Sequence, residues 1–503
     1  MRVYPTEAEF VRLARHGNVI PVYGAFKADL ETPVSALLKL DDGRYSFLLE
    51  SVEGEARVAR YSFLGTAPRM VFSSTGRHIE QVDFGARCRP RVRSFVTRQD
   101  PLVELERLMA GFRPVRVPGL PRFFGGFVGY LGYDIVQFLE RLPRHRTNDL
   151  RLPDVMLMLA DSMAIFDHAQ HTLQLVVNVL VQPRQDPAAL YRQAVRRIEA
   201  MAQQLQRPLP AVRRRPRRGP LAVRSNTSRA EFTRMVARAK QDIRAGEIIQ
   251  AVLSQRFERS VGCQPFDIYR SLRSLNPSPY MFFLRFGDVC LVGSSPEMLV
   301  RSEDGHLETR PIAGTRRRGA TPREDERLAR QLLASPKERA EHLMLVDLGR
   351  NDLGRIARPG SVRTPEFMTI ERYSHVLHLV SSVTATLRPG RTAFDVLRAT
   401  FPAGTVTGAP KVRAMEIIAQ LERCARGPYA GAVGYISFTG NLDTCITIRT
   451  ILTKGRRAYV QAGAGIVADS QPSREYQETV NKARGMLEAI AMAEQGSDPK
   501  PGL

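Results

Sequence analysis

A stretch rich in proline and arginine at 206–220 interrupts every periodic pattern along the chain and constrains how its 503 residues can fold. Proline removes a backbone donor and fixes φ, so neither a helix nor a central strand continues through such a segment. We therefore expect an N-terminal part at 1–205, a linker at 206–225, a second part at 226–495 and a disordered tail at 496–503. This length suits two or three ordinary domains or one large two-part enzyme.

Strand-like and helix-like patterns are mixed on both sides of the linker. Alternating or continuous apolar runs predict strands at 45–49, 123–130, 173–181, 248–257, 280–286, 289–293, 432–438, 445–453 and 458–461. Apolar residues at helical spacing predict helices at 188–204, 322–334, 336–347, 393–400, 411–422 and 473–492. A further helix is expected from the capping box Ser228-x-x-Glu231 to Gly246, because Ser and Glu at this spacing satisfy each other's free backbone donors.

Two pairs of glutamates, Glu338 with Glu341 and Glu475 with Glu478, lie within expected helices. Residues three apart share a helix face, where like charges repel unless a cation compensates them. Carboxylates from two helices suit a hard cation such as Mg2+, which binds one or two carboxylates and keeps several waters. The alternative is two solvated helix faces.

The composition is that of a globular protein, with 43% hydrophobic and 25% charged residues. The first twenty residues lack the apolar core of a signal peptide, and no stretch is long and apolar enough to cross a membrane. We therefore expect a cytoplasmic protein that does not engage a membrane. The cysteines show no metal or redox spacing, and their odd number argues against a disulfide framework; they lie at 88, 263, 290, 424 and 445.

A formal net charge of +23, with a cluster of arginines at 213–218, raises the alternative of a nucleic-acid-binding protein. The basic residues are spread along the chain, however, and no zinc-finger spacing or aromatic-interleaved RNA motif accompanies them. We expect no nucleic-acid partner. A positive field also attracts a small anionic substrate.

Several segments resemble the chorismate-using enzymes, and among them the component I family of anthranilate synthases. In chain order they are 246–250, 293–297, 310–315, 341–347, 350–352, 401–411 and 463–467. The resemblance covers nearly the whole chain. It implies an α/β (α+β) fold in which β-sheets are sandwiched between helices and the N- and C-terminal parts pack together. It also implies chorismate as substrate and Mg2+ as cofactor, held by the four glutamates directly or through water.

The resemblance also assigns catalytic roles. Glu297 is similar to the acid that protonates the departing hydroxyl group, a task that requires a raised pKa; the alternative is a surface glutamate at a strand end. His378 is similar to the family's catalytic histidine, and its alternative is a core histidine on the strand face that holds Val376 and Val380. Thr405 matches a further site position.

Substrate contacts are implied at Thr405, Tyr429, Arg449, Gly463, Gly465, Lys482, Ala313, Gly314 and Thr315. Arg449 could grip a carboxylate with two parallel donors, whereas Lys482 would act as a point charge; a structural ion pair is the alternative for each. Gly463 and Gly465 are expected to form a glycine turn whose bare backbone approaches an anionic ligand.

Two positions indicate the reaction. Family members that add water to chorismate carry lysine at the position of Gln250, since water needs a base whereas neutral ammonia does not. Members that make 4-amino-4-deoxychorismate carry a nucleophilic lysine at the position of Ala313, and a methyl group cannot form that adduct. Together they predict amination at C2 followed by loss of pyruvate to give anthranilate. An enzyme that stops at the 2-amino intermediate, and an isochorismate synthase, stay open as alternatives.

A tryptophan feedback site is implied, by resemblance alone, at two segments. The residues are Leu49, Glu50, Ser51, Pro279, Tyr280 and Met281.

No cysteine lies in the sharp glycine-flanked turn that a glutaminase nucleophile needs, so ammonia is expected from a separate glutamine amidotransferase subunit. The resemblance implies a heterotetramer of two large and two small subunits. A remote alternative is a non-catalytic, basic nucleic-acid-binding protein.

Overall fold

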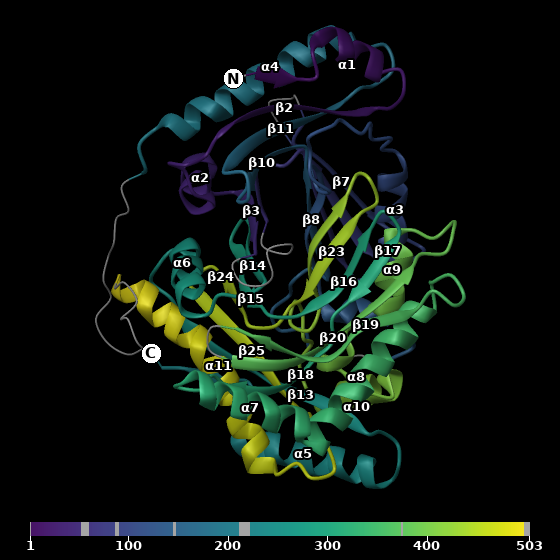
Figure 1. The fold of residues 1–503 in the computed structure, drawn as a ribbon, viewed down its shortest axis with the longest axis vertical. Helices are drawn as coiled ribbons and strands as arrows, with labels where there is room; N and C mark the ends of the chain where they lie inside the picture. Colours follow the sequence, from purple (N-terminus) through teal and green to yellow (C-terminus); the bar gives the residue numbers. More distant parts are fainter. Residues whose placement is uncertain are drawn as a thin grey trace.

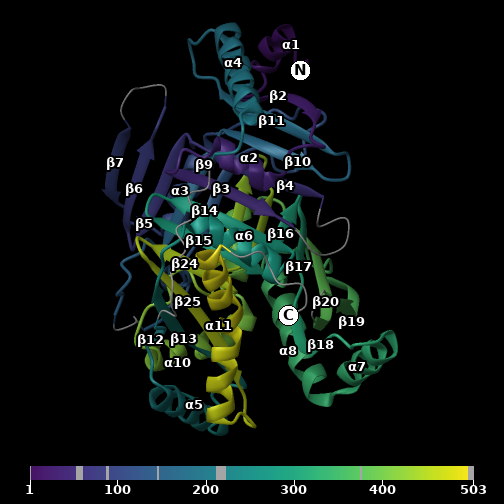
Figure 2. The ribbon, with the colours of Figure 1, turned by 90° about the vertical axis from the view of Figure 1, so that its left-hand side faces the viewer.

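Two large antiparallel sheets organise the chain. The computed structural model describes residues 2–51, 60–85, 90–143, 147–210, 222–373 and 376–496. The sheets lie face to face across the molecule, and helices cover their outer faces (Figures 1 and 2). The expected α/β sandwich is therefore confirmed.

The first sheet contains 13 strands within the described residues. From one edge to the other it runs β1 (Arg2–Tyr4), β2 (Val19–Lys27), β11 (Thr172–Leu180), β10 (Ser162–Asp167), β4 (Tyr61–Thr66), β3 (Tyr45–Glu50), β14 (Tyr280–Phe286), β15 (Val289–Ser295), β24 (Thr450–Lys454), β25 (Arg457–Ile466), β13 (Gln250–Ser260) and β12 (Arg224–Ser225). The short β21 (Gly408–Ala409) also pairs with β13.

The second sheet contains 12 strands within the same residues. Its order is β18 (Ile312–Arg317), β20 (Val376–Thr386), β17 (His306–Thr309), β16 (Met298–Glu303), β23 (Leu442–Ile446), β22 (Ala432–Ser437), β8 (Gly126–Leu131), β9 (Val155–Ala160), β5 (Met70–Thr75), β6 (His78–Asp83) and β7 (Arg91–Val96). The irregular β19 (Arg363–Arg372) pairs with β20.

Both sheets draw strands from both sides of the expected linker. In the first sheet β3 pairs with β14, and in the second β8 pairs with β22. The two parts of the chain are thus packed together as expected, because each supplies about half of a shared sheet rather than a sheet of its own. Residues 211–221 of the linker, with most of its arginines, and 497–503 of the tail lie outside the described residues, so the proposed division at 206–225 stays a prediction.

The helices pack on the outer faces of the sheets. They are α1 (Glu7–Leu13), α2 (Pro33–Leu40), α3 (Pro101–Ala110), α4 (Pro187–Gln206), α5 (Arg229–Arg244), α6 (Pro265–Leu275), α7 (Pro322–Ala334), α8 (Pro336–Gly354), α9 (Ala393–Thr400), α10 (Lys411–Leu421) and α11 (Pro472–Gln495), with the 3-10 turns η1 (Tyr133–Phe138) and η2 (Gly404–Val406). The predicted capping box opens α5, with Glu231 N donating to Ser228 Oγ at 3.2 Å and Ser228 N to Glu231 Oε2 at 2.9 Å. None of the described helices combines the length and apolar character needed to cross a membrane.

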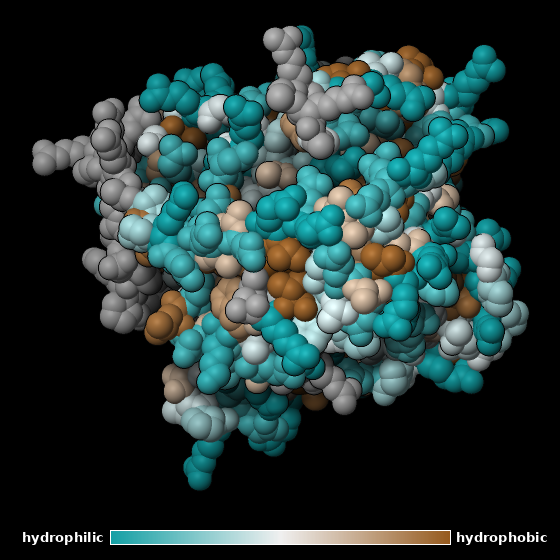
Figure 3. All heavy atoms as spheres, turned by 90° about the horizontal axis from the view of Figure 1, so that it is seen from above, coloured by the Kyte–Doolittle hydropathy of each residue, from teal (hydrophilic) through white to brown (hydrophobic). Residues whose placement is uncertain are grey.

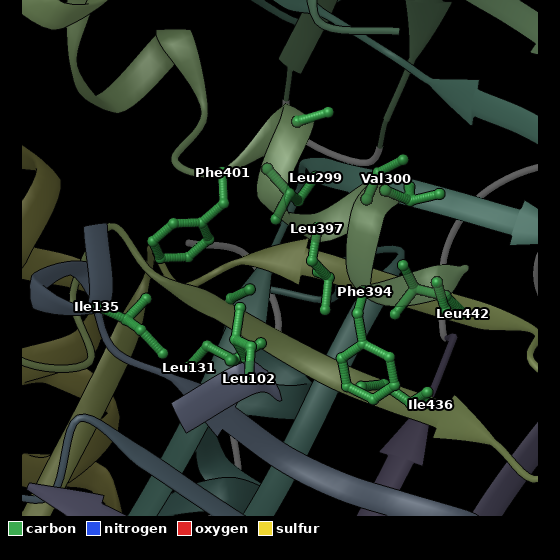
Figure 4. Packing of buried hydrophobic residues seen from close by; sticks show 14 of the residues in the cluster. Leu102, Leu131, Ile135, Leu299, Val300, Phe394, Leu397, Phe401, Ile436 and Leu442 are labelled. Carbon is green, nitrogen blue, oxygen red and sulfur yellow. The ribbon is translucent and has the colours of Figure 1, made fainter. Parts of the chain in front are cut away.

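The strand periodicity sorts the core into layers. On β8, Val128 and Tyr130 join the cluster between the two sheets, whereas Phe127 and Leu131 join the cluster beneath the helices, as successive side chains on a strand must point to opposite faces. Figure 4 shows that second cluster, where Phe394, Leu397 and other side chains of α9 and its surroundings pack on the second sheet. Hydrophilic residues predominate on the face in Figure 3, around a small group of hydrophobic ones.

The strand predicted at 445–453 is wrong, because the structure divides it between two strands. The run 445–453 is interrupted: β23 ends at Ile446 in the second sheet, and β24 begins at Thr450 in the first. The apolar pattern continues through both strands, so it gives no sign that the chain crosses between sheets there. At the crossing Arg449 adopts φ of 50°, a left-handed conformation that is uncommon for a residue with a side chain.

Candidate active site

The site residues come from β13 and β25 of the first sheet, with α11 packed on β25, and from β18 and β20 of the second sheet, with α8 packed on both (Figure 2). Gln250 is the first residue of β13, while Gly463 and Gly465 belong to β25 opposite Ser254 and Val252. The expectation of a glycine turn is thus wrong, because β25 stays paired with β13 up to Ile466. At both positions the neighbouring side chains leave no room for a Cβ atom. A Cβ would lie 2.7 Å from the Tyr429 hydroxyl at position 463, and 2.4 Å from Gln250 Nε2 at position 465.

Glu297 lies between β15 and β16 and is buried, with 8% of its surface exposed. Burial disfavours the charged form and raises the pKa of its carboxyl group to about 8. The Thr405 hydroxyl and the Lys482 ammonium partly offset this rise in pKa. Thr405 Oγ1 is itself buried and makes no well-formed hydrogen bond within the described residues, so it can still bind another group. A protonated carboxyl group and an available hydroxyl group therefore face the same space.

His378 lies on β20 opposite Thr315 of β18. Its Nδ1 is 3.2 Å from Gly314 O and 3.2 Å from Thr315 Oγ1. A carbonyl oxygen can only accept, so Nδ1 carries the hydrogen and Nε2 keeps its lone pair. Burial lowers the pKa of the imidazole, which favours the neutral form. Ala313, which precedes Gly314 and Thr315, is buried. A bulge in β18 lies between Ala313 and Thr315.

Three polar side chains enter the site beside the glycines. Lys482 Nζ donates to Gly463 O at 3.1 Å, and Arg449 Nη1 donates to Lys482 O at 3.3 Å. Burial lowers the pKa of Arg449 and raises the pKa of Tyr429 to about 12. At neutral pH this corner therefore presents a neutral phenol hydroxyl and two cations, a combination that can bind a carboxylate.

Two of the four glutamates are paired with cations. Glu338, in the first turn of α8, lies 3.2 Å from Arg316 Nη1, and Glu478, on α11, lies 2.7 Å from Lys482 Nζ. The ion pair foreseen as the alternative for Lys482 is thus present, whereas the pair between Glu338 and Arg316 was not foreseen. Such half-exposed pairs are worth little, so a stronger ligand can displace them.

Glu341 and Glu475 are the more deeply placed members of each pair. Burial raises the pKa of both carboxyl groups, and the neighbouring Glu338 and Glu478 raise it further. Lys337 lies close enough to lower the pKa of both, which places the two helices' acidic faces beside the same lysine. Within the described residues, no three acidic, histidine or cysteine side chains are clustered tightly enough to hold a metal as they stand.

Some site neighbours were not foreseen from the sequence. Lys337 on α8 faces both acidic pairs, Lys411 forms an ion pair of 2.6 Å with Asp352 beside Glu297, and Arg426 is buried against Tyr429. Lys411 and Asp352 belong to the segments 401–411 and 350–352 that carry the family resemblance, whereas Lys337 and Arg426 lie in none of those segments.

All six residues of the expected feedback site line one cavity between the two sheets. Leu49, Glu50 and Ser51 come from the end of β3, and Pro279, Tyr280 and Met281 from the start of β14. Glu50 is held by Tyr269 and by Arg273 Nε at 3.2 Å, so its charge is compensated. Ser51 Oγ has no hydrogen-bond partner within the described residues.

The second sheet supplies the opposite wall of this cavity. Asp443 of β23 accepts from Tyr280 at 3.0 Å, from Arg301 at 3.1 Å and from Arg122 at 3.1 Å. Asp443, Arg301 and Arg122 were not foreseen, because they lie far in the sequence from β3 and β14. The cavity thus joins both sheets through one buried carboxylate.

The chain belongs to the family of chorismate binding enzymes, whose sequence profile matches residues 51–488. Among curated proteins it is similar to anthranilate synthase component 1 of Acetivibrio thermocellus, at 47% identity over 97% of this chain and 99% of that one, and to that of Aquifex aeolicus, at 47% identity over 97% and 98%. Among solved structures it is similar to anthranilate synthase component I of Streptococcus pneumoniae, with 37% identity, a TM-score of 0.75 and coverage of 92% and 98%. The menaquinone-specific isochorismate synthase of Escherichia coli, at 20% identity and a TM-score of 0.70 over 96% and 99%, shares the fold.

Proposed function

We propose that this chain is the chorismate-aminating component of an anthranilate synthase, catalysing the first committed step of tryptophan biosynthesis. Chorismate and ammonia would give anthranilate, pyruvate and water. Gln250 is the observation that carries the proposal. Its amide is buried, and Oε1 has no hydrogen-bond partner within the described residues. A neutral acceptor can hold ammonia by an N–H group without protonating it, whereas a lysine there would be a base suited to activating water.

Glu297 would protonate the departing hydroxyl group. With a pKa of about 8 it is largely protonated at neutral pH, so it can donate at the moment when the C–O bond breaks and ammonia attacks C2. The Thr405 hydroxyl is placed to orient this carboxyl group or the leaving oxygen.

His378 would accept a proton in the second stage. After amination, the imidazole would take the proton from C2 while the bond between the ring carbon and the ether oxygen breaks; the ring becomes aromatic, and the departing enolpyruvate takes up a proton to give pyruvate. The lowered pKa keeps the imidazole neutral, and the contact of Nδ1 with Gly314 O leaves Nε2 as the acceptor. A histidine serves this purpose well, since small shifts move its pKa across the working pH.

The two carboxylates of chorismate would be bound by two neighbouring sets of groups, which meet where Lys482 pairs with Glu478. Arg449, Lys482 and the Tyr429 hydroxyl offer donors beside the bare backbone of Gly463 and Gly465. The acidic faces of α8 and α11 would hold Mg2+, which would neutralise the charge of the ring carboxylate. The donor set fits this ion, because burial and like charge already raise the pKa of Glu341 and Glu475.

The cavity between the sheets would bind tryptophan as a feedback inhibitor. Its mixed lining suits an amino acid with a large apolar ring, since Met281 and Phe63 offer apolar surface while Glu50 and the Ser51 hydroxyl offer polar contacts. This regulatory role is supported by the convergence of all six expected residues on one cavity.

A separate glutamine amidotransferase would supply the ammonia, in a heterotetramer of two large and two small subunits in the cytoplasm. Every cysteine within the described residues is a free thiol, which suits a reducing compartment. Burial raises the pKa of Cys445 and Cys290 above that of an ordinary thiol, the opposite of what a glutaminase nucleophile requires.

The proposal is tested by supplying chorismate, excess ammonium and Mg2+ to the purified chain and following anthranilate fluorescence. A rising signal that EDTA abolishes is expected. Disappearance of chorismate without fluorescence would show that the site serves another reaction of chorismate. Strict dependence on glutamine and a second subunit would contradict the use of free ammonia.

A further inference from the structure

One fully buried arginine contacts three separate parts of the candidate active site. Arg426 lies between α10 and β22, and 1% of its surface is exposed. Its Nη1 donates to Val406 O and its Nη2 to Val252 O, each at 2.7 Å. Val406 directly follows Thr405 in η2, and Val252 lies two residues after Gln250 on β13, opposite Gly465.

The third contact is with aromatic rings. The guanidinium carbon of Arg426 lies 5.6 Å from the ring centre of Tyr429 and 4.7 Å from that of Tyr133. A cation over an aromatic face is attracted to it, and more strongly where water is excluded. The same planar group therefore links η2, β13 and the turn that carries Tyr429.

Glu422 compensates the buried charge. It accepts from Arg426 Nε at 2.9 Å and from Nη2 at 2.8 Å, and also from Ser254 N at 2.8 Å and Ser254 Oγ at 2.9 Å. Gln461 Nε2 donates to Ser254 Oγ at 2.9 Å, which ties β25 to the same network. A buried ion pair gives weak evidence of net stability, because desolvation offsets the attraction. What a fully hydrogen-bonded network does supply is fixed geometry.

We propose that Arg426 is a positioning residue for chorismate turnover, holding Thr405, Tyr429 and the start of β13 at fixed positions relative to one another. It reaches no substrate itself, since it is buried and its Nε, Nη1 and Nη2 groups all donate to two carbonyl oxygens and one carboxylate. The inference rests on the proposed function in so far as Thr405, Tyr429 and Gln250 are assigned to the site.

The test compares three variants that separate geometry from charge and stability. Arg426→Lys keeps the charge but cannot reach both carbonyl oxygens and the carboxylate at once. The double variant Glu422→Leu with Arg426→Met replaces the buried pair by apolar side chains of similar size, a change that proteins often tolerate. The control is Arg423→Lys, because Arg423 is exposed and pairs with Glu231 at 3.0 Å, away from the site.

Chorismate consumption is measured, so that the result does not depend on which product forms; absence of anthranilate would count against the proposed function alone. For Arg426→Lys and for the double variant we expect kcat to fall about 100-fold, the order of loss seen when reacting groups are misplaced by about an ångström. KM should rise by less than about tenfold, because Arg449 and Lys482 still bind the carboxylate and only the Tyr429 hydroxyl is displaced. The control should match the wild type.

A double-mutant cycle with Thr405→Val shows whether Arg426 acts through the η2 segment. If it does, the loss of kcat caused by Arg426→Lys should be at least about fivefold smaller once the Thr405 hydroxyl is gone, because the two residues act partly as a unit and only the effect through Tyr429 and β13 remains. Three results would each overturn the inference. They are a loss of kcat in the double variant equal to the product of the losses in the single variants, an unchanged kcat in Arg426→Lys, and a loss of kcat that simply follows a lowered melting temperature.

Discussion

At the scale of single residues, surroundings decide chemistry more than residue type. Glu297 and Glu338 are both glutamates of the candidate site. Burial raises the pKa of Glu297 to about 8, whereas Glu338 forms an ion pair with Arg316. The sequence motif predicted that Glu297 belongs to the site. Only the packing around β15 and β16 shows why its carboxyl group keeps its proton at neutral pH.

The pKa of Glu297 predicts the pH dependence of the reaction. The active form is protonated, so kcat should fall as pH rises through about 8. Replacing Glu297 by Gln should lower kcat by roughly 100-fold or more and remove this alkaline limb, since amide groups do not titrate. Steady-state rates between pH 6 and about 9.5 check both points; a variant that retains the limb would assign the titration to another group.

The same shift has a consequence for stability. The pKa is raised above its ordinary value of 4.5 in the folded state, so the folded protein binds the extra proton and loses stability relative to the unfolded chain as pH rises from 4.5 to about 8. The melting temperature of Glu297→Gln minus that of the wild type should therefore be larger at pH 8.5 than at pH 5. An equal difference at both pH values would contradict the raised pKa.

Gln250 should determine which nucleophile is used. Gln250→Lys introduces a base beside the site and should raise the share of hydroxylated product at the expense of anthranilate. Gln250→Met is the matched control, because it fills similar space without donating or accepting; it should lose amination and gain no water addition. Product ratios by chromatography check this. If the lysine variant gives no hydroxylated product at any pH, the role assigned to Gln250 is wrong.

At the scale of elements, β25 shows how two glycines within a strand leave space for neighbouring side chains. Gly465 lies opposite Val252, and its missing Cβ leaves space that Gln250 Nε2 occupies. Pairing with β13 holds this backbone in a strand, so its role is close approach rather than a turn.

A single methyl group should therefore disturb the site. Gly465→Ala places a Cβ 2.4 Å from Gln250 Nε2, so the amide must move and kcat should fall at least roughly tenfold. Gly485→Ala on α11 is the control, since nothing lies within 4 Å of its added Cβ. There alanine should leave activity unchanged and stabilise the helix by up to about 1 kcal/mol. Equal activity in both variants would show that the crowding at 465 does not matter.

Local patterns predicted elements well where one signal dominated. The helices at 322–334 and 393–400 match α7 and α9 to the residue, because Pro or a capping threonine marks their starts. The patterns failed at 445–453 and at Gly463 and Gly465, where pairing with distant strands decides the backbone. Periodicity reports which face is apolar, not which sheet a strand joins.

At the scale of the whole molecule, the shared sheets connect the cavity between the sheets with the candidate active site. Asp443 and Cys445 of β23 line the cavity between the sheets, and the same chain runs on to Arg449 of the candidate site. A ligand that moves β23 would therefore move Arg449, which is proposed to bind a carboxylate of the substrate. Sequence motifs foresaw six residues of that cavity, yet not Arg301 and Asp443, which the pairing of β16 with β23 brings there, or Arg122, which donates to Asp443.

Filling that cavity should separate regulation from catalysis. Ser51→Phe places a ring in space that tryptophan would occupy, so inhibition by tryptophan should weaken at least roughly tenfold. The kcat without tryptophan should stay close to that of the wild type. The cavity that Ser51 lines shares no residue with the part of the candidate active site around Glu297 and Thr405. Inhibition curves for both proteins check this, and unchanged inhibition would remove Ser51 from the tryptophan site.

The most direct measurement supplies 15N-ammonium and chorismate to the chain in 18O-water and identifies the products by mass spectrometry. One 15N atom in each anthranilate, one pyruvate for each chorismate consumed and no 18O in the aromatic product is the predicted result. Chorismate converted to a product that carries 18O and no 15N would contradict the account, because water rather than ammonia would then be the nucleophile beside Gln250.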